Sequence, residues 1–378
     1  MFGDYIMARF IPIAKPVIGD EEVDLVVKVL RSGRLAQGPM VREFEERFAE
    51  YIGVDYAIAV SNGTCALDLM LKAYGIKSGD EVITTPFTFI ATANAILYQG
   101  AKPVFVDIDL ETYNIDPDRV LEAITSKTKA ILVVHLYGHP AEMKALREIA
   151  EDHKLLLLED AAQAHGAEYM GVKVGALGNA AAFSFYPTKN ITTGEGGMIT
   201  TNDRSVAEKL RILRDQGQQG KYNHVVLGYN YRMTEIQAAI GIAQLGKIEK
   251  FLKAREANAE FLTRNLKKIP YITTPSKKPY VRHAWHQYVI RVKENSPLKR
   301  DYIAETLKNM GIQTAIHYPK PVHHQPLYRS LGYPQNICPN AIKASKTVLS
   351  IPVHPALTVE DLNYIVNSII KLFEKHIE

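Results

Sequence analysis

Cysteine is scarce in this chain, because Cys65 and Cys338 are the only two among 378 residues. They form no CxxC pair and cannot build a disulfide framework, which excludes a disulfide-stabilised scaffold and a cysteine-rich metal site. Long apolar runs are also missing, since no segment approaches the roughly 20 residues of a membrane helix. The first residues, Met1 to Tyr5, lack the charged-then-apolar order of a signal peptide. We therefore expect a cytoplasmic protein with no membrane association, and Met7 as an alternative start.

A strong charge excess is absent as well. The net charge is +4, from 45 basic and 41 acidic residues, and no long basic run occurs, which argues against nucleic acid as a partner. His135, His139 and His165 lack the HExxH type of spacing, so we expect no metal site. Apolar residues make up 47% of the chain, as in ordinary globular proteins, and the length suits one large and one smaller domain.

Short apolar runs alternate with helical segments over the first two thirds of the chain. The runs are uniformly apolar, which is typical of strands buried on both faces of a parallel sheet. One helical segment, Thr64–Tyr74, carries its apolar residues on a single stripe. The runs are Tyr56–Val60, Val82–Thr84, Val104–Asp107, Ala130–Val134, Leu155–Leu158 and Ala180–Phe185. The pattern predicts an α/β fold: a large domain with a mainly parallel seven-stranded type of sheet flanked by helices, and a ligand site at the carboxyl ends of the strands.

Two helices are predicted before this alternation. The first extends from about Glu21 to Ser32, with a stripe formed by Val23, Val26, Val27 and Leu30 and with Gly33 to end it. The second follows the Gly38-Pro39 break and extends from Val41 to Ile52.

The pattern changes near Met233. A capping box, Thr234 to Gln237, opens a long helix that reaches about Lys268, with a break or bend at Gly241 or Gly246. Beyond it we expect a smaller C-terminal α+β domain. Its predicted elements are a strand at Gln287–Val292, a helix that begins at Ser296-Pro297 and ends at Gly311, and a final helix capped by Thr358. The predicted domains are residues 1–245, which bind the cofactor, and 246–378, with the N-terminal segment packing on the smaller domain.

Three segments at predicted strand ends could carry chemistry. Ser61-Asn62-Gly63-Thr64 lies between a strand and a helix, where free N–H groups and a hydroxyl suit a phosphate; an ordinary N-cap turn is the alternative. Asp160 ends a buried strand and would need a cationic partner, unless it is a solvated turn acid or an N-cap. Lys189 follows Ser184 among small and glycine residues, where desolvation could make it a Schiff-base lysine rather than a solvated one.

Together these segments supply a phosphate turn, a carboxylate and a lysine at the ends of strands in one sheet. Pyridoxal phosphate (PLP) requires that set, because its phosphate needs an anchor, its ring nitrogen an anion and its C4′ carbon an amine. The sequence therefore predicts PLP as the cofactor.

These stretches resemble the DegT family of sugar aminotransferases, which have the type I fold of PLP-dependent aminotransferases. The resemblance extends from Ile11-Pro12, through the Gln37-Gly38-Pro39 turn, to Ile351–Pro355. Its most specific motifs are Ser61–Leu67, Pro86–Ala93, Glu159–Gly166, Phe183–Gly197 and Gly228–Gly241.

The resemblance implies a role for each matching residue. Lys189 would hold PLP as an imine and then move the proton, Asp160 would pair with the pyridinium nitrogen, and Gln163 would lie near the ring oxygen. Phe89 would stack on the ring, although a core aromatic fits the sequence equally well. The phosphate would contact Gly63, Thr64 and Ser184, together with Asn230 of the neighbouring subunit. A homodimer with shared active sites would then be the functional unit.

The substrate is less constrained by the sequence. His317, Tyr318 and His323 lie in a proline-interrupted segment, 316–328, which resembles the family's substrate-facing loop; surface or packing roles are the alternative. The implied reaction moves an amino group from an amino acid, glutamate by resemblance, to the keto group of a nucleotide-linked deoxysugar. By the same resemblance, glutamine at position 163 favours reaction at the C3 carbon of the sugar.

Four alternatives stay open. A cyclitol ketone could be the acceptor, or the protein could be a PLP-binding regulator without turnover. A PLP-dependent sugar dehydratase would carry histidine in place of Lys189. A desulfurase would need a catalytic cysteine, for which Cys338 is the candidate.

Overall fold

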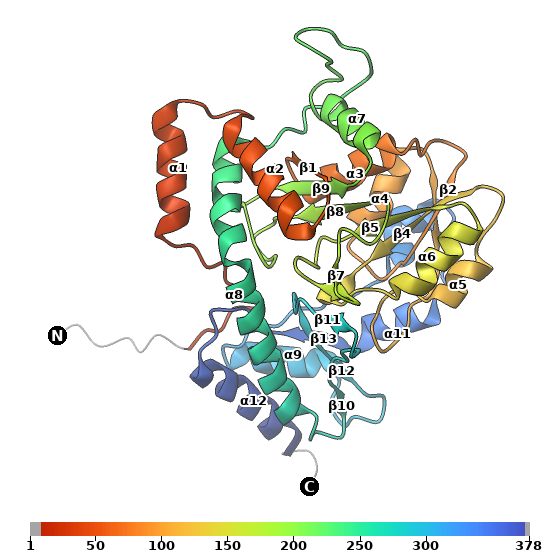
Figure 1. The fold of residues 1–378 in the computed structure, drawn as a ribbon. Helices are drawn as coiled ribbons and strands as arrows, with labels where there is room; N and C mark the ends of the chain where they lie inside the picture. The colour runs from red at the N-terminus through yellow and green to blue at the C-terminus, as the bar shows by residue number, and fades with distance from the viewer. Residues whose placement is uncertain (1–8, 375–378) are drawn as a thin grey trace.

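The computed structural model describes residues 9–374 (Figure 1). Met7, the alternative start, lies outside the described residues. None of the helices in the described range is long and apolar enough to cross a membrane.

A seven-stranded sheet forms the centre of the larger part of the molecule, with the strand order β1-β9-β8-β5-β4-β2-β3. β9 is antiparallel to both of its neighbours, and the remaining pairs are parallel. The strands are β1 (Tyr56–Val60), β2 (Glu81–Thr84), β3 (Lys102–Phe105), β4 (Thr128–Val134), β5 (Leu156–Asp160), β8 (Ala180–Ser184) and β9 (Gly197–Thr201). The predicted α/β class with a mainly parallel seven-stranded sheet is confirmed.

The sequence missed β9 and misplaced β3. β9 has only Met198 and Ile199 as large apolar residues before two threonines, which is too short a run for the pattern to show. β3 begins and ends two residues before the predicted Val104–Asp107. It ends early because the carboxylate of Asp107 accepts backbone N–H groups from Asn340 and Ala341, at 2.8 and 2.9 Å.

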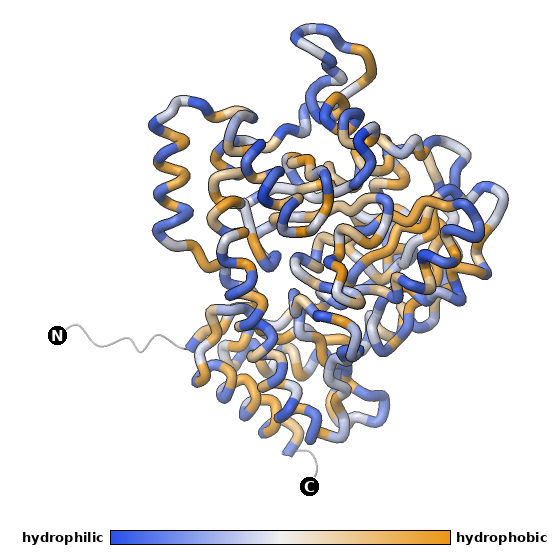
Figure 2. The backbone as a smooth tube through the Cα atoms, viewed as in Figure 1, coloured by the Kyte–Doolittle hydropathy of each residue, from blue (hydrophilic) through white to orange (hydrophobic). Residues whose placement is uncertain are grey.

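Helices cover both faces of the sheet and bury its apolar side chains (Figure 1). One face packs against α3 (Gly63–Ala73), α4 (Ala91–Tyr98) and α7 (Arg204–Arg214). The other face packs against α2 (Pro39–Ile52), α5 (Pro117–Glu122), α6 (Met143–Asp152) and the first half of α8 (Glu235–Leu266). Figure 2 shows the sheet as the apolar centre of this layered arrangement.

The helix α8 extends unbroken past both glycines at which we expected a break or bend. Gly241 permits close packing rather than a kink, because a Cβ there would lie 2.6 Å from the ring of Phe44. The capping box at its start is present, since the Thr234 hydroxyl accepts from the Gln237 N–H. The predicted domain boundary at residue 245 falls inside this helix, whose later residues enter a separate core. The division into two domains stays a prediction.

The C-terminal region forms that separate core around a three-stranded sheet, β10 (Ile272–Thr273), β12 (Tyr288–Val292) and β13 (Val348–Ile351). Ile11 of the N-terminal segment belongs to the same core. The other elements are η1 (Leu136–Gly138), β6 (Glu168–Tyr169), β7 (Val172–Lys173), β11 (Val281–Arg282), α9 (Arg300–Asn309), η2 (Val322–His324), α10 (Pro326–Ser330), α11 (Pro339–Thr347) and α12 (Val359–Glu374).

Two helix predictions are corrected by the structure. α9 begins at Arg300 instead of Ser296-Pro297, because the Ser296 hydroxyl forms a turn with the backbone of Leu298. The first helix, α1 (Asp20–Ser32), has the predicted bounds to within one residue, but its predicted stripe packs only in part: Val26 and Val27 are partly buried, whereas Val23 and Leu30 are 52% and 53% exposed. Val29, which was not part of the predicted stripe, is buried, and α1 packs against α8.

Candidate functional site

The strands β1, β5 and β8 point in one direction, so their carboxyl ends meet at one edge of the sheet. Gly63 follows β1, Asp160 ends β5 and Ser184 ends β8. Gly63 and Ser184 lie against each other, because a Cβ on Gly63 would be 2.6 Å from the Cβ of Ser184. The structure therefore brings together the turn and the serine, Ser184, that were both predicted to bind the phosphate.

The N-terminus of α3 forms an anion site at this edge. The Asn62 side chain caps the helix by accepting the Cys65 N–H at 2.9 Å. The N–H groups of Gly63 and Thr64 precede the first intrahelical bonds, so they are free to point at a ligand, and the helix dipole favours a negative charge there.

Asp160 carries a buried carboxylate, only 5% exposed, that is surrounded by hydrogen-bond donors. Its side chain accepts a hydrogen bond from the Thr92 hydroxyl at 2.7 Å and one from the Ala162 N–H at 3.2 Å. Burial raises the pKa of Asp160, while these two hydrogen bonds and the charge of Lys189 act in the opposite direction. A buried carboxylate of this kind needs a cationic partner, which a protonated pyridine nitrogen supplies.

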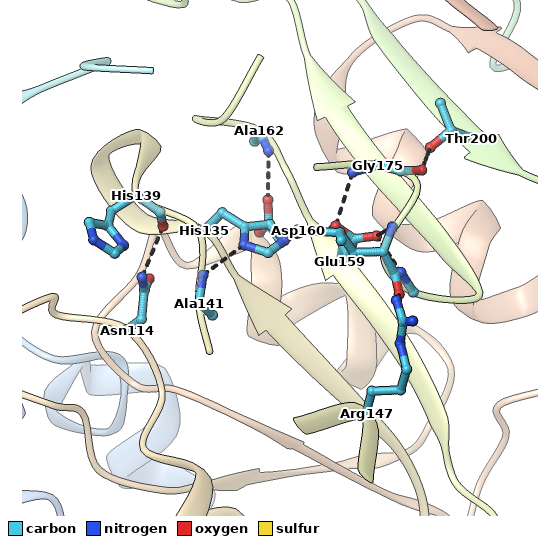
Figure 3. Close-up of polar contacts among 12 residues, drawn as sticks. Asn114, His135, His139, Ala141, Arg147, Glu159, Asp160, Ala162, Gly175 and Thr200 are labelled. Atoms are coloured by element: carbon cyan, nitrogen blue, oxygen red, sulfur yellow. Dashed lines mark hydrogen bonds and ion pairs between the residues drawn. The ribbon is translucent and has the colours of Figure 1, made fainter. Parts of the chain in front are cut away.

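A second buried carboxylate lies behind Asp160 (Figure 3). Glu159 accepts the backbone N–H groups of Gly175, Leu177 and Gly178, at 2.6 to 3.0 Å. It also contacts His135 Nε2 at 2.9 Å. His135 Nδ1 accepts the Ala141 N–H, so Nε2 carries the proton and donates it to Glu159. The His135 N–H donates to the Asp160 carbonyl, so this network fixes the ends of β4 and β5 together.

Lys189 lies in a turn in which its N–H donates to the Tyr186 carbonyl, and its side chain is partly buried. Burial lowers the pKa of Lys189 to about 8, against the negative charge of Asp160, which raises it. A lysine in this state has a substantial fraction of neutral, nucleophilic amine near neutral pH.

Gln163 and two aromatic residues, Phe89 and Tyr318, form another part of the site. Gln163 Oε1 accepts the Tyr137 N–H at 2.8 Å, and its Nε2 donates to the Tyr318 hydroxyl at 3.0 Å. The ring of Phe89 is 57% exposed, and its centroid is 6.3 Å from that of Tyr318. Phe89 is therefore not a core residue, and its ring is available to a ligand.

The predicted substrate residues separate into two places. His317 pairs with the Ser350 hydroxyl at 2.8 Å, and burial together with the charge of Lys189 lowers its pKa to about 4, so it is neutral beside the site. Its carbonyl accepts the Tyr137 hydroxyl. His323 is fully buried against Phe105 of the edge strand β3. The described contacts of His323 thus lie in the packing between β3 and the C-terminal region.

Asn230 is exposed at the base of a long loop, 216–229, where it forms an isolated bridge with Asp215. Figure 1 shows this loop projecting from the top of the molecule, next to α7. The next residue, Tyr231, accepts the Ser61 N–H at 2.9 Å, so the end of this loop lies beside the phosphate turn of its own chain. The role of Asn230 toward a neighbouring subunit stays a prediction.

Sequence reasoning missed the residues that support Asp160. Thr92 carried no spacing signal, because its contact with Asp160 depends on where the first turn of α4 lies relative to the end of β5. Glu159 could have been found from strand alternation, since its side chain must leave β5 on the face opposite to that of Asp160. A buried acid on that face needs donors, and His135 at the end of the adjacent strand was a candidate.

A phosphate turn, a buried acid and a lysine of lowered pKa at one sheet edge define the site of a PLP-dependent aminotransferase. The residues fit the cofactor: the α3 N-terminus with Gly63, Thr64 and Ser184 would hold the phosphate, Asp160 the ring nitrogen and Lys189 the C4′ carbon.

Comparison with known proteins identifies the family. The model of the DegT/DnrJ/EryC1/StrS aminotransferase family matches residues 16–370, and this chain belongs to that family. A pleiotropic regulatory protein from Geobacillus stearothermophilus is 46% identical over 349 residues, covering 92% of each chain. The dTDP-3-amino-3,6-dideoxy-alpha-D-galactopyranose transaminase from Aneurinibacillus thermoaerophilus is 43% identical over 343 residues, covering 90% of this chain and 92% of the relative.

Solved structures of other proteins have the same fold as this chain. A Streptococcus pneumoniae protein described as a sugar aminotransferase, solved in its PLP form, superposes with a TM-score of 0.92 at 30% identity, covering 97% of this chain and 99% of the other. PLP is thus the cofactor of this chain, as its sequence predicted.

Proposed function

We propose that this protein transfers an amino group from an amino acid, glutamate being the expected donor, to the keto carbon of a nucleotide-linked deoxysugar. The observation that carries the proposal is the position of Lys189. Its pKa is lowered by burial, and it interacts electrostatically with Asp160, which lies at the same sheet edge as the phosphate turn.

The chain's own residues supply proton transfer and orientation. When bound, PLP supplies an electron sink for the α-carbon of the donor and a carrier for the amino group. With the cofactor bound, the Lys189 amine would move the proton between the α-carbon and the C4′ carbon, in one direction for the donor and in the reverse direction for the sugar. Asp160 keeps the ring nitrogen protonated, and Thr92 and Ala162 hold Asp160 in place.

The acceptor is proposed from two supports. The Aneurinibacillus relative is named for a 3-amino sugar linked to a nucleotide. Gln163, with Tyr318 as its partner, lies where the family resemblance favours reaction at C3. We therefore propose the C3 ketone of a nucleotide-linked deoxysugar, with a cyclitol ketone as a measurable alternative.

Other readings fit the structure less well. A desulfurase would need a reactive thiolate, but Cys338 is buried, and burial raises the pKa of its thiol to about 12. The Geobacillus relative is named for regulation. A regulator without turnover, however, would not require a lysine such as Lys189 whose pKa is lowered to a value suited to proton transfer.

We also propose a homodimer with shared active sites. Apolar side chains are exposed on and near α1, where Ile18, Val23 and Leu30 are each more than half exposed. The projecting loop carries a second apolar group, Val225 to Leu227, which Figure 2 shows in orange on the outer limb of that loop. In such a dimer the exposed Asn230 would reach the partner's site, as the family resemblance implies. The cytoplasmic location stays a prediction.

The test is product analysis with an isotope label. The purified protein is loaded with PLP and incubated with ¹⁵N-glutamate and a panel of nucleotide-linked 3- and 4-ketosugars and a cyclitol ketone. We expect a labelled amino sugar from a 3-ketosugar, identified by mass spectrometry. No labelled product from any acceptor, with PLP bound, would favour the regulatory reading.

A further inference from the structure

The segment at the end of the projecting loop, residues 229–231, is held against the phosphate turn of its own chain. The carbonyl of Tyr231 accepts the Ser61 N–H at 2.9 Å, and the Tyr231 N–H donates to the Arg214 carbonyl at 3.0 Å. Ser61 directly precedes Asn62, the residue that caps α3. The backbone of Tyr231 therefore helps to set where the phosphate turn begins.

The side chain of Tyr231 fixes that backbone in place. Its hydroxyl donates to Asp68 Oδ2 at 3.1 Å, and its ring stacks on that of Tyr229, with the ring centroids 4.8 Å apart. Asp68 belongs to α3, the helix whose N-terminus forms the anion site. Tyr231 thus contacts the same unit twice, at the turn through its carbonyl and within the helix through its hydroxyl.

Asp68 is a costly residue at its position. It is 4% exposed, in a stretch of α3 whose other residues between 66 and 71 are buried and apolar. Burial raises the pKa of Asp68, whereas the hydrogen bonds from Gln99 and Tyr231 lower it. Gln99 Nε2 donates to Asp68 Oδ1 at 2.5 Å, and the Tyr231 hydroxyl serves the second oxygen. Because a buried carboxylate needs such donors, Asp68 favours one definite position of Tyr231.

Two neighbouring residues of this segment face different surroundings. Asn230 is exposed and is predicted to serve the neighbouring subunit, whereas the Tyr231 hydroxyl reaches Asp68 within its own chain. Asn230 forms a β-bridge with Asp215, and consecutive side chains of extended backbone point to opposite sides. One short segment can therefore contribute to two sites.

We propose that Tyr231 is a positioning residue for the phosphate turn of its own chain: Asp68 holds its hydroxyl, and its carbonyl in turn holds Ser61. With Ser61 held, the free N–H groups of Gly63 and Thr64 keep the direction in which a phosphate accepts them. Tyr231 acts through Ser61 and does not itself contact the phosphate. The inference rests on the proposed function, because it requires that the turn binds the phosphate of PLP.

The first experiment measures ligand affinity in the cofactor-free protein. PLP uptake is followed by absorbance, and inorganic phosphate, which occupies only the phosphate site, is titrated as a competitor. Tyr231→Phe keeps the ring but removes the hydroxyl, so PLP and inorganic phosphate should both bind about 2- to 12-fold more weakly, the usual net effect of one hydrogen bond. Pyridoxal, which lacks the phosphate, should be taken up as by the wild type, because Lys189 and Asp160 are unchanged.

Two further variants separate positioning from general stability. Tyr229→Phe removes the hydroxyl of the stacked neighbour, for which no hydrogen-bond partner is found within residues 9–374, and should leave both affinities unchanged. Asp68→Leu removes the acceptor instead of the donor and should weaken PLP and inorganic phosphate by a similar factor. Combined with Tyr231→Phe it should weaken them no further, because both changes break the same hydrogen bond.

Subunit mixtures show which chain's turn Tyr231 serves. In a hybrid dimer with one Lys189→Ala chain, only the site built on the other chain's lysine is active. Tyr231→Phe in the chain that keeps Lys189 should raise the PLP concentration for half-maximal activity. The same change in the Lys189→Ala chain should leave that concentration at its wild-type value.

Three results would overturn the inference in distinguishable ways. If Tyr231→Phe binds PLP and inorganic phosphate as wild type does, or weakens pyridoxal as much as PLP, Tyr231 only stabilises the fold. If the loss of affinity follows the Lys189→Ala chain in the hybrids, Tyr231 acts on the partner's site. If Thr64→Val combined with Ser184→Ala leaves the affinity for inorganic phosphate unchanged, the turn does not bind the phosphate and the proposed site itself fails.

Discussion

At the scale of single residues, the site depends on how Asp160 is held. The Thr92 hydroxyl donates to Asp160, and because that uses its only proton, the Thr88 hydroxyl at 2.9 Å must donate to Thr92. This chain of hydroxyls aims one strong donor at the carboxylate that serves the ring nitrogen.

Replacing Thr92 by valine tests this arrangement. Thr92→Val keeps the shape but removes the donor, so we expect the pKa of Asp160 to rise, the free energy of unfolding to fall by about 1–3 kcal/mol and PLP to bind more weakly. Thr92→Ser, which keeps the hydroxyl, is the control and should behave nearly as wild type. PLP titration and urea unfolding give both quantities; wild-type PLP affinity in Thr92→Val would contradict this role.

The lowered pKa of Lys189 predicts a pH dependence. Only the neutral amine attacks PLP, so the rate at which the cofactor-free protein takes up PLP should rise with pH, reach half its maximum near pH 8 and level off above it. The negative charge of Asp160 raises the pKa of Lys189, so Asp160→Asn should move the midpoint to lower pH. Stopped-flow absorbance measures the rate. A rate that keeps rising toward pH 10, as for an ordinary lysine, would show that burial does not act on this amine.

The sequence predicts the site residues that follow directly from strand ends. Gly63, Asp160 and Ser184 each end or follow a strand of one sheet, so the topology alone brings them to one edge. Thr92 could not be predicted in this way. Its contact with Asp160 forms only when the first turn of α4 reaches the end of β5, and Thr92 does not differ in local pattern from its neighbours.

At the scale of elements, the network around Glu159 joins three segments. It holds the end of β5, the end of β4 through His135, and the turn that contains Gly175, Leu177 and Gly178. The adjacent residue, Asp160, is thereby fixed relative to the sheet edge (Figure 3).

Glu159→Gln tests this joint function. The amide places N–H donors where the carboxylate accepts backbone N–H groups, so at least one buried donor loses its acceptor. We expect the free energy of unfolding to fall by about 3–5 kcal/mol, with a lower PLP content at equal concentration. Glu151→Gln on the exposed side of α6 is the control. Chemical unfolding measures the change; a loss no larger than that of the control would mean that the network does not stabilise the edge.

The elements themselves were predicted unevenly, for physical reasons. Uniformly apolar runs identified the parallel strands, because burial on both faces leaves a strong signal. β9 carries a weaker signal, and the start of α9 was obscured by a serine turn that the sequence pattern does not distinguish from an N-cap. Two residues of the predicted α1 stripe, Val23 and Leu30, stay exposed within the chain, as expected if they belong to the proposed interface between copies.

At the scale of the whole molecule, the proposed dimer makes each site depend on two chains. Mixing Lys189→Ala subunits with Asn230→Ala subunits should restore part of the activity, because one site of each hybrid dimer keeps both residues. Either variant alone should be weak, the first in catalysis and the second in PLP affinity. Activity assays on mixtures with verified subunit exchange give the answer, and no rescue in mixed dimers would argue against a shared site.

The central claim is that Lys189 carries the cofactor, and borohydride reduction followed by peptide mass spectrometry tests it most directly. Borohydride reduces the imine between PLP and its lysine to a stable amine, so the attachment point can be read from the labelled peptide. We predict a pyridoxyl group on Lys189 and on no other lysine of the purified PLP-bound protein, and no label after Lys189→Ala. A label on a different lysine, or a protein that takes up no PLP, would contradict the account.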